Sequence, residues 1–552
     1  MTTLIETRGP QMFPTLRPAQ LARLEGYGKR ARVEAGEILA QSGEREGRLV
    51  VVLTGSVEIL RTGLSGDERV ILHGPGEFTG ELSTLRGARS LVRARVHEAG
   101  EVLIIDHDNL RKLVQRDAEL SELFMRAFIL RRMGLIEAQG GDVILIGSRH
   151  SAGTLRLQQF LTRNGTPYHW VDIDNEAGVE TLLERFHVSV DEVPIVVCRA
   201  EKVLKNPSNE QLAECLAINP QMDDATVRDV LVIGAGPAGL AAAVYAASEG
   251  LDVLVIETTA PGGQAGSSSK IENYLGFPTG ISGQALAGRA LVQAQKFGAD
   301  VAVASSAVRL RCDRRPYEIE LSNGHTVRGR AVIIATGAEY RQLALADLAR
   351  FVGVGVYYAA THVESQLCTE EEVIVVGGGN SAGQAAVYLA RSCRRVNILV
   401  RSSGLADSMS RYLIGRIEDT PNITLHVRTQ LTALEGSDRL ERVTWRDAAN
   451  GADTTSDIRH VFLMTGAVPN TRWLQGCVPL DDRGFVRVGS DLRAEDLLAA
   501  RWPLQRPPYL METGIPGIFA VGDVRSGSVK RVASAVGEGS ISVQLVHRVL
   551  QE

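Results

Sequence analysis

The chain has 552 residues, too many for one hydrophobic core, and this length suggests three or four domains. Its formal net charge of −5 disfavours nucleic-acid binding, because nucleic-acid-binding proteins present a basic surface. We recognise no secretory leader and no run of about 18 apolar residues, so we expect a cytoplasmic protein without a membrane span. The six cysteines are scattered and none is in C-x-x-C spacing, which predicts reduced thiols and neither a disulfide framework nor a metal site.

Short apolar strands separated by glycine turns recur between Ala31 and Asp106. This spacing predicts an all-β barrel or jelly roll, and the segment from Asp108 to about Gly134 is predicted to form two helices. The order resembles the cyclic-nucleotide-binding domain family, and we place this domain at residues 12–138. No helix-turn-helix follows it, so the resemblance does not extend to the family's transcription factors.

The segment FTGELSTLRGARSLVRARV carries most of that resemblance. The family's phosphate cassette starts with G-E-L and ends in an arginine and a small residue, and the corresponding residues here are Gly80, Glu81, Leu82, Arg89 and Ser90. The resemblance implies that Arg89 meets the cyclic phosphate of cyclic AMP or cyclic GMP and that Glu81 accepts the ribose 2′-hydroxyl. The spacing is shorter than usual, and Leu91 replaces a small residue. The alternative is therefore a barrel that binds no nucleotide and serves only to make contacts with other parts of the protein.

Residues 141–218 show the order strand, helix, strand, helix, strand. This order resembles a glutaredoxin-like thioredoxin fold, with Pro194 in the place of the cis-proline. The turn after the first strand would hold C-x-x-C, and here it reads Ser148-Arg149-His150-Ser151. A serine hydroxyl forms no disulfide, so the resemblance implies a domain without thiol chemistry. A polar linker at residues 219–227 follows.

An apolar strand beginning near Arg228 runs into a glycine-rich turn, an alanine-rich helix and a second strand that ends in Glu257. The turn consists of Gly234, Gly236, Pro237, Ala238 and Gly239. Its glycines permit a tight bend, close approach of a pyrophosphate and close packing of helix on strand. Glu257 is placed to accept both hydroxyls of an adenosine ribose. The sequence therefore predicts a first dinucleotide site.

A second unit of the same kind runs from Glu371 to Arg401. Its turn consists of Gly377, Gly379, Asn380, Ser381 and Ala382. Arg401 stands where the first unit has an acid, and a guanidinium can pair with a 2′-phosphate, so NADPH is favoured over NADH. The alternative is a surface arginine with no ligand. Arg411 is a second candidate for the phosphate, or a solvated helix residue.

From Arg228 to the C-terminus the chain resembles the low-molecular-weight thioredoxin reductase family, through both fingerprints and the segments GGQ, IENYLGFP, ATG and GIFAVGDV. The further flavin-binding residues that we infer are Gly263, Gln264, Asn273, Ala335, Thr336, Gly337, Gly522, Asp523, Arg531 and Val532. Asp523 can accept a hydrogen bond from a ribityl hydroxyl, and the helix that starts after Arg531-Val532 can face the isoalloxazine. The resemblance implies two nested Rossmann-like α/β domains: a FAD domain in two pieces (228–345 and 467–552) with an NADPH domain (346–466) inserted. It also implies a homodimer whose two domains rotate to present either the nicotinamide or the redox centre to the flavin.

In that family C-A-T-C follows a tyrosine just before the second fingerprint, whereas here Tyr358 is followed by Ala359-Ala360-Thr361-His362. Neither cysteine place holds sulfur, so a dithiol relay to thioredoxin is not available by this route. His362 is a candidate proton donor beside the flavin; the alternative is that it only fills space or points to solvent. We expect Cys368 to be a buried thiol without a partner cysteine nearby.

We therefore expect an NADPH-dependent FAD oxidoreductase of the thioredoxin reductase-like superfamily, with electrons passing from the flavin to a small acceptor or a redox protein. The cyclic-nucleotide-like domain would regulate domain motion. One alternative is a nucleotide-responsive sensor or scaffold with little turnover. Another is a disulfide reductase that uses cysteines which the sequence does not pair.

Overall fold

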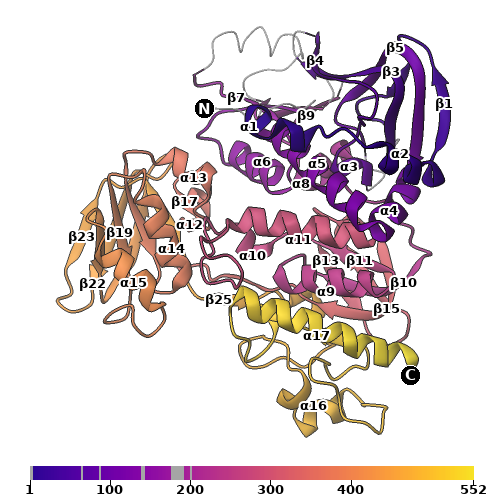
Figure 1. Ribbon diagram of the computed structural model, residues 1–552. Helices are drawn as coiled ribbons and strands as arrows, with labels where there is room; N and C mark the ends of the chain where they lie inside the picture. Colours follow the sequence, from indigo (N-terminus) through magenta and orange to yellow (C-terminus); the bar gives the residue numbers. More distant parts are fainter. Residues whose placement is uncertain are drawn as a thin grey trace.

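A computed structural model describes residues 4–45, 47–63, 66–85, 89–137, 143–175, 192–198 and 202–552 (Figure 1). We divide the described chain into four parts, each with its own sheet. They are the N-terminal unit (residues 4–137), the middle unit (143–216), the first-fingerprint unit (227–340 and 467–552) and the second-fingerprint unit (348–463). In Figure 1 the N-terminal and middle units lie above the first-fingerprint unit, and the second-fingerprint unit lies to one side.

The N-terminal unit is built on an antiparallel sheet of order β1-β5-β3-β4, with β2 paired to β5. Its strands are β1 (Lys29–Val33), β2 (Ile38–Ala40), β3 (Arg48–Gly63), β4 (Gly66–His73) and β5 (Arg93–Asp106). Its helices are α1 (Leu4–Met12), α2 (Pro18–Leu24), α3 (Leu82–Leu85), α4 (His107–Arg116) and α5 (Ala118–Glu137). Helices α4 and α5 are the two helices that the sequence predicts, and they cover the sheet through a core that contains Phe78, Phe124 and Phe128.

The middle unit has a four-stranded sheet of order β7-β6-β8-β9. Its elements are β6 (Val143–Ile146), α6 (Ala152–Arg163), β7 (His169–Val171), β8 (Ile195–Cys198), β9 (Lys202–Lys205) and α8 (Asn209–Leu216). Strands β6 and β7 are parallel, while β8 is antiparallel to both β6 and β9. The Val193–Pro194 bond is cis, as predicted. The second predicted helix of this unit falls on residues 176–191, outside the described residues.

The first-fingerprint unit is a seven-stranded sheet of order β12-β11-β10-β15-β14-β13, in which β26 pairs with the C-terminal end of β15, beyond the part that pairs with β14. Its main elements are β10 (Val227–Ile233), α9 (Pro237–Ser248), β11 (Val253–Ile256), α10 (Gly263–Gly266), α11 (Gly283–Phe297), β12 (Asp300–Ala302), β13 (Ala307–Arg311), β14 (Tyr317–Leu321), β15 (Thr326–Ile334), β26 (Ile518–Ala520) and α17 (Val532–Gln551). The apolar strands β10, β11, β12, β15 and β26 are parallel, as expected of strands buried on both faces. Because β26 pairs with β15, two segments distant in sequence complete one sheet.

The second-fingerprint unit has a parallel sheet of order β17-β24-β18-β19-β20 and a separate antiparallel sheet β21-β22-β23. Its elements are α12 (Leu348–Phe351), β17 (Val356–Tyr357), α13 (His362–Leu367), β18 (Glu372–Val376), α14 (Asn380–Leu389), β19 (Arg395–Leu399), α15 (Arg411–Glu418), β20 (Ile423–His426), β21 (Thr429–Glu435), β22 (Arg442–Asp447), β23 (Asp453–Ser456) and β24 (His460–Leu463). The chain enters and leaves it through β16 (Ala338–Tyr340) and β25 (Ala467–Pro469), which pair with each other. The antiparallel pair β16–β25 thus connects the second-fingerprint unit to the first-fingerprint unit.

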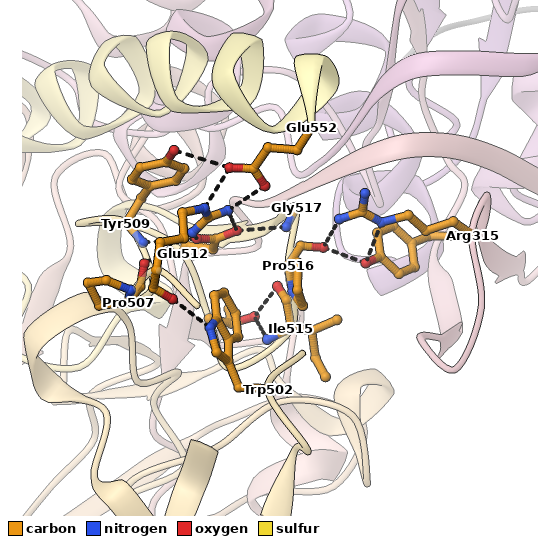
Figure 2. Close-up of polar contacts among 12 residues, drawn as sticks. Arg315, Trp502, Pro507, Tyr509, Glu512, Ile515, Pro516, Gly517 and Glu552 are labelled. Atoms are coloured by element: carbon orange, nitrogen blue, oxygen red, sulfur yellow. Dashed lines mark hydrogen bonds and ion pairs between the residues drawn. The ribbon is translucent and has the colours of Figure 1, made fainter. Parts of the chain in front are cut away.

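A polar cluster that includes Tyr509, Glu512 and Glu552 holds the end of α17 in place (Figure 2). The Arg506 guanidinium donates to Glu552 Oε1 at 2.6 Å and to Glu512 Oε2 at 2.7 Å. Glu512 is fully buried, and the Tyr509 ring centroid lies 3.8 Å from the guanidinium carbon. Because a buried carboxylate needs a charged partner, this pairing stabilises the loop after α16 (Ala494–Ala499) against the last helix.

The cysteines correct the sequence prediction in two places. Cys312 and Cys477 form a disulfide across 165 residues of sequence, so the expectation of reduced thiols throughout is wrong. Cys368 is buried as predicted, but its Sγ lies 3.6 Å from that of Cys393, so the expectation of no partner cysteine nearby is also wrong. Spacing along the chain missed both pairs because folding brings them together: the disulfide joins the two pieces of the first-fingerprint unit, and the second pair lies beyond the ends of α13 and α14, 25 residues apart.

Within the described ranges, no helix is both long and apolar enough to cross a bilayer. In the same ranges, no cluster of three or more His, Cys, Asp or Glu side chains has the arrangement of a metal site.

Candidate functional site

The first glycine turn joins β10 to α9 and is formed by backbone contacts that leave no room for side chains at two positions. Gly234 has φ +106°, and a Cβ there would lie 2.3 Å from the Ala335 carbonyl oxygen. A Cβ on Gly239 would lie 1.8 Å from the Gly234 carbonyl oxygen. At Gly236, by contrast, the nearest atom to a Cβ would be 4.0 Å away. The open side of Gly236, at the N-terminus of α9, is where a pyrophosphate can approach the backbone.

Glu257 follows β11 and faces the same turn. Its carboxylate accepts hydrogen bonds from the backbone N–H groups of Ala235 (2.8 Å), Thr259 (2.9 Å) and Ala260 (3.3 Å). Two carboxylate oxygens offer about four acceptor sites, and these three bonds leave about one, on Oε2, for a ribose hydroxyl. The residues present therefore fit the adenosine end of a dinucleotide.

The remaining flavin-binding candidates come from both pieces of the first-fingerprint unit. Gly263 and Gln264 begin α10, where Gln264 donates to the Ala338 carbonyl oxygen, and Asn273 is exposed on the following loop. The Thr336 hydroxyl of the Ala335-Thr336-Gly337 turn donates to the Asn470 carbonyl oxygen at 2.9 Å. This bond joins the turn to the second piece of the unit.

In the C-terminal piece, Gly522 and Asp523 form a short 3₁₀ turn after β26, and Arg531 precedes Val532, the first residue of α17. Burial raises the pKa of Asp523 above its usual range, and Lys530 opposes this shift. A half-buried carboxyl group at the edge of the sheet is suited to bind a hydroxyl-bearing ligand such as a ribityl chain.

The second glycine turn, between β18 and α14, resembles the first, except that Ala382 stands where the first turn has Gly239. Gly377 has φ +144°, and a Cβ there would lie 2.3 Å from the Met464 carbonyl oxygen, while a Cβ on Gly379 would meet nothing within 4 Å. Asn380, Ser381 and Ala382 are the first residues of α14. The Asn380 side chain accepts the backbone N–H of Ser410 at 2.8 Å, which holds the start of α15 beside the turn.

Arg401 and Arg411 lie on the loop and helix beyond this turn. Both are exposed, Arg411 as the first residue of α15. Arg401 follows the buried residues Leu399 and Val400 and is the second residue after β19, one position further along than Glu257, which directly follows β11. A guanidinium at this strand end can pair with a 2′-phosphate.

The Ala359-Ala360-Thr361-His362 segment leads into α13. Thr361 caps the helix, and its N–H and hydroxyl both donate to Glu364, which is fully buried. His362 is the first residue of α13 and is exposed. Exposure agrees with the alternative that His362 points to solvent, and its role as a proton donor remains a hypothesis.

The cassette-like segment begins at Gly80, which has φ +97°, and Leu82 begins the short helix α3. Glu81 is buried, and its carboxylate accepts hydrogen bonds from Ser83 and from Arg132 of α5 (Nε, 2.8 Å). Arg132 also donates to the Gly165 carbonyl oxygen of the middle unit at 3.1 Å. Glu81 therefore already has a cationic partner, which a ribose hydroxyl would have to share or displace.

Arg89 and Ser90 lie on the loop before β5 and line a cavity between units. The cavity is also lined by Ser83 and Arg132 from the N-terminal unit and by Val301 and other residues of the first-fingerprint unit. The buried Nε of Arg89 has no hydrogen-bond partner in the described chain, and an unpaired buried guanidinium nitrogen is suited to an anionic ligand.

Arg163, at the end of α6, is a residue that sequence reasoning missed. It donates to the Gly263 carbonyl oxygen at 3.0 Å and so supports the loop that carries Gly263 and Gln264. Burial lowers its pKa below the usual arginine range, against the opposing charges of Glu257 and Glu364. No local signal could have found it, because it belongs to the middle unit.

Two Rossmann-type turns, one followed by an acid and one by an arginine, define a protein that binds two dinucleotides. Comparison with known proteins agrees: residues 228–539 match the pyridine nucleotide-disulphide oxidoreductase family, and residues 30–117 match the cyclic nucleotide-binding domain family. The chain belongs to the pyridine nucleotide-disulphide oxidoreductase family, with an added N-terminal cyclic nucleotide-binding domain.

Individual relatives give the same result. A thioredoxin reductase of Mycolicibacterium smegmatis is 33% identical over 315 residues, which are 57% of this chain and 94% of that protein. A thioredoxin reductase of Bacillus subtilis is 32% identical over 333 residues, 60% of this chain and 97% of that protein. The crystal structure of T. acidophilum thioredoxin reductase aligns with a TM-score of 0.53 and 27% identity, covering 59% of this chain and 99% of that one. The protein is thus a thioredoxin reductase-like, flavin-dependent NAD(P)H oxidoreductase.

Proposed function

We propose that the protein takes electrons from NADPH and delivers them from its flavin directly to a small acceptor or a redox protein, without a redox disulfide beside the flavin. The observation that carries this proposal is the pairing of two complete dinucleotide turns with Ala359 and His362 at the two cysteine places. When bound, FAD and NADPH supply the hydride transfer and the storage of electrons.

The residues of this chain bind and orient both nucleotides. Gly236 and the N-terminus of α9 receive the FAD pyrophosphate, Glu257 the ribose and Asp523 the ribityl chain. Arg401, with Arg411 nearby, selects NADPH through the 2′-phosphate. We propose the division into domains at 12–138, 141–218, 228–345, 346–466 and 467–552 that the sequence suggests. A glutaredoxin-like fold for the middle unit, a homodimer and a cytoplasmic location stay predictions.

An anaerobic reduction assay tests the proposal. NADPH is added to the yellow protein and bleaching of the flavin is followed; then ferredoxin, a quinone, oxygen, or oxidised thioredoxin is added. We expect bleaching followed by rapid re-oxidation by at least one acceptor other than thioredoxin. Fast bleaching with no acceptor turned over would favour the sensor or scaffold alternative. Absence of bleaching would contradict the proposal itself.

One observation favours the disulfide-reductase alternative: Cys312 and Cys477 form a disulfide. The same assay with Cys477→Ser separates the two functions. If this pair relays electrons, reduction of thioredoxin disappears in the variant while bleaching by NADPH remains. We expect instead that neither step depends on Cys477.

We propose further that a cyclic nucleotide binds at the cassette and regulates the enzyme, with Arg89 as the phosphate partner. Support comes from the unpaired Nε of Arg89 and from Arg132, which joins Glu81 to the middle unit. Calorimetric titration of cyclic AMP and cyclic GMP should show heat for one of them, and Arg89→Leu should abolish it. No heat with either nucleotide would favour a domain kept for contacts.

A further inference from the structure

In Figure 1, helix α6 of the middle unit lies above the first-fingerprint unit and beside α13 of the second-fingerprint unit. Its C-terminal end is held by the first-fingerprint unit through several hydrogen bonds. Besides the bond from Arg163 to Gly263, Gln284 donates to the Thr162 carbonyl oxygen at 2.8 Å and Asn164 donates to the Thr259 carbonyl oxygen at 3.2 Å.

The same two units also share a hydrophobic core. Leu157, Phe160 and Leu161 of α6 belong to one continuous cluster of buried side chains that extends to Val230 and Phe519 of the first-fingerprint sheet. Because this buried cluster is continuous across the two units, separating them would expose apolar side chains to water. We therefore treat α6 and the first-fingerprint unit as one body.

The opposite face of α6 contacts the second-fingerprint unit. Ala152, Leu155 and Gln159 follow helical spacing and share one side of the helix. Leu155 is 4% exposed and packs in the core cluster that contains Tyr357 and Ala360. Leu155 thus inserts an apolar side chain beside the Ala359–His362 segment.

Two further contacts complete this face. A Cβ on Gly353 would lie 3.0 Å from the Ala152 Cβ, so the two backbones approach closely. The Gln159 side-chain amide donates to Glu364 Oε1, while Glu364 Oε2 accepts the Thr361 N–H at 2.7 Å. Glu364 is therefore shared between the cap of α13 and helix α6.

We propose that Leu155 and Gln159 are positioning residues that lock the second-fingerprint unit in one orientation against the flavin-binding unit. This inference rests on the proposed function and on the domain rotation that the resemblance to the thioredoxin reductase family implies, which brings the nicotinamide to the flavin. Among the described residues, α6 contacts the first unit at several places and shares a core with it, whereas its contacts with the second unit are one stripe of three residues and the charge of Arg163 acting on Glu364. Reorientation therefore breaks the contact between α6 and α13, exposes Leu155 and leaves Glu364 without its amide partner.

Within the described residues, one ion pair joins the two fingerprint units directly, between Arg416 and Glu272, whose side chains are 47% and 16% exposed. A partly exposed ion pair contributes less than a buried apolar contact, so we expect the α6 stripe to dominate the lock.

The test uses the full-length, FAD-loaded protein and a pair of compensating variants. Gln159→Glu places a second carboxylate against Glu364 and should open the lock. The double variant Gln159→Glu/Glu364→Gln reverses donor and acceptor and should close it again. Arg156→Ala is the matched control, because Arg156 lies on α6 but donates to Asn209 (2.9 Å) and Pro207 (2.7 Å) within the middle unit.

The first readout is backbone hydrogen exchange of residues 361–368 without NADPH. We expect exchange about tenfold faster in Gln159→Glu, close to wild type in the double variant and unchanged in Arg156→Ala. Leu155→Ala should act in the same direction as Gln159→Glu. Unchanged exchange in Gln159→Glu, or no recovery in the double variant, would overturn the lock. Hydrogen exchange is measured without NADPH and so does not depend on electron transfer. If NADPH fails to bleach the flavin, the proposed function is contradicted, but hydrogen exchange still tests the lock.

The second readout separates positioning from binding. Turnover of NADPH with ferricyanide should change several-fold in Gln159→Glu and return in the double variant. The Kd of NADP⁺ should stay constant, since the nucleotide site lies wholly on the second-fingerprint unit. A changed Kd with constant turnover would show that the residues act on binding and not on orientation.

Discussion

The two glycine turns have the same course but differ in how closely they are packed. In the first-fingerprint unit, the third position must be glycine, because a Cβ on Gly239 would lie 1.8 Å from the Gly234 carbonyl oxygen. In the second-fingerprint unit, Ala382 occupies that position, fully buried, and its Cβ is accommodated. The difference shows that α9 approaches its strand more closely than α14 does.

The strand ends that follow the two turns differ as well. Glu257 is engaged by three backbone N–H groups before any ligand binds, whereas Arg401 is exposed. The acidic side chain at the first strand end is therefore held in place by the backbone around it, whereas the arginine at the second strand end lies at the surface. The predictions that follow compare the two units, from the largest expected effect to the smallest.

Gly239→Ala should abolish FAD binding, because the clash with a backbone oxygen cannot be relieved by a side-chain movement; we expect a cost of about 3 kcal/mol or more. Ala382→Gly is the matched change in the other turn and should cost about 1 kcal/mol. The ratio of flavin to protein absorbance and the thermal unfolding curve measure both. Equal effects of the two variants would remove the contrast between the turns.

Arg401→Glu should lower the preference for NADPH over NADH by about 100-fold, since a carboxylate repels the 2′-phosphate that a guanidinium binds. The measurement is kcat/KM for both nucleotides with ferricyanide as acceptor. Arg411→Ala is the comparison and should have a smaller effect. A preference that does not respond to Arg401 would leave this residue as a surface arginine.

Cys477→Ser should destabilise the first-fingerprint unit by about 2–4 kcal/mol, because Cys312–Cys477 joins its two pieces across the whole inserted unit. Cys393→Ser changes the neighbouring thiol pair of the other unit, which is not bonded, and should cost less. Denaturant unfolding followed by flavin release reports the first unit. If a reducing agent leaves the wild-type curve unchanged, the disulfide does not stabilise the protein.

Acid should destabilise the second-fingerprint unit through His460 of β24. Burial lowers the pKa of His460 from 6.5 to about 4, with help from the charges of Arg459 and Arg439. The unfolded chain therefore binds more protons between these two values, and stability falls as the pH falls through this window, by on the order of 2 kcal/mol. Thermal unfolding at several pH values, with His460→Gln as control, measures the effect. A variant with the same pH slope as wild type would exclude His460 as its source.

Much of the fold could be read from local patterns. Both glycine turns, the strand ends at Glu257 and Arg401 and the helices α4 and α5 were predictable, because each depends on residues close together in the chain. The family match over residues 228–539 confirms the class of enzyme inferred from those turns. Site residues within it, His362 above all, stay predictions.

Other features depend on contacts that no local pattern encodes. The partner of Glu81 is Arg132, from a helix that the sequence places correctly but cannot orient. The Cys312–Cys477 disulfide and the docking of Leu155 and Gln159 on α13 join segments more than a hundred residues apart. The sequence by itself determined which nucleotide turns this protein has, because a turn is a local backbone conformation. Only the tertiary structure decided which units hold them in place, because packing between distant segments depends on the whole fold.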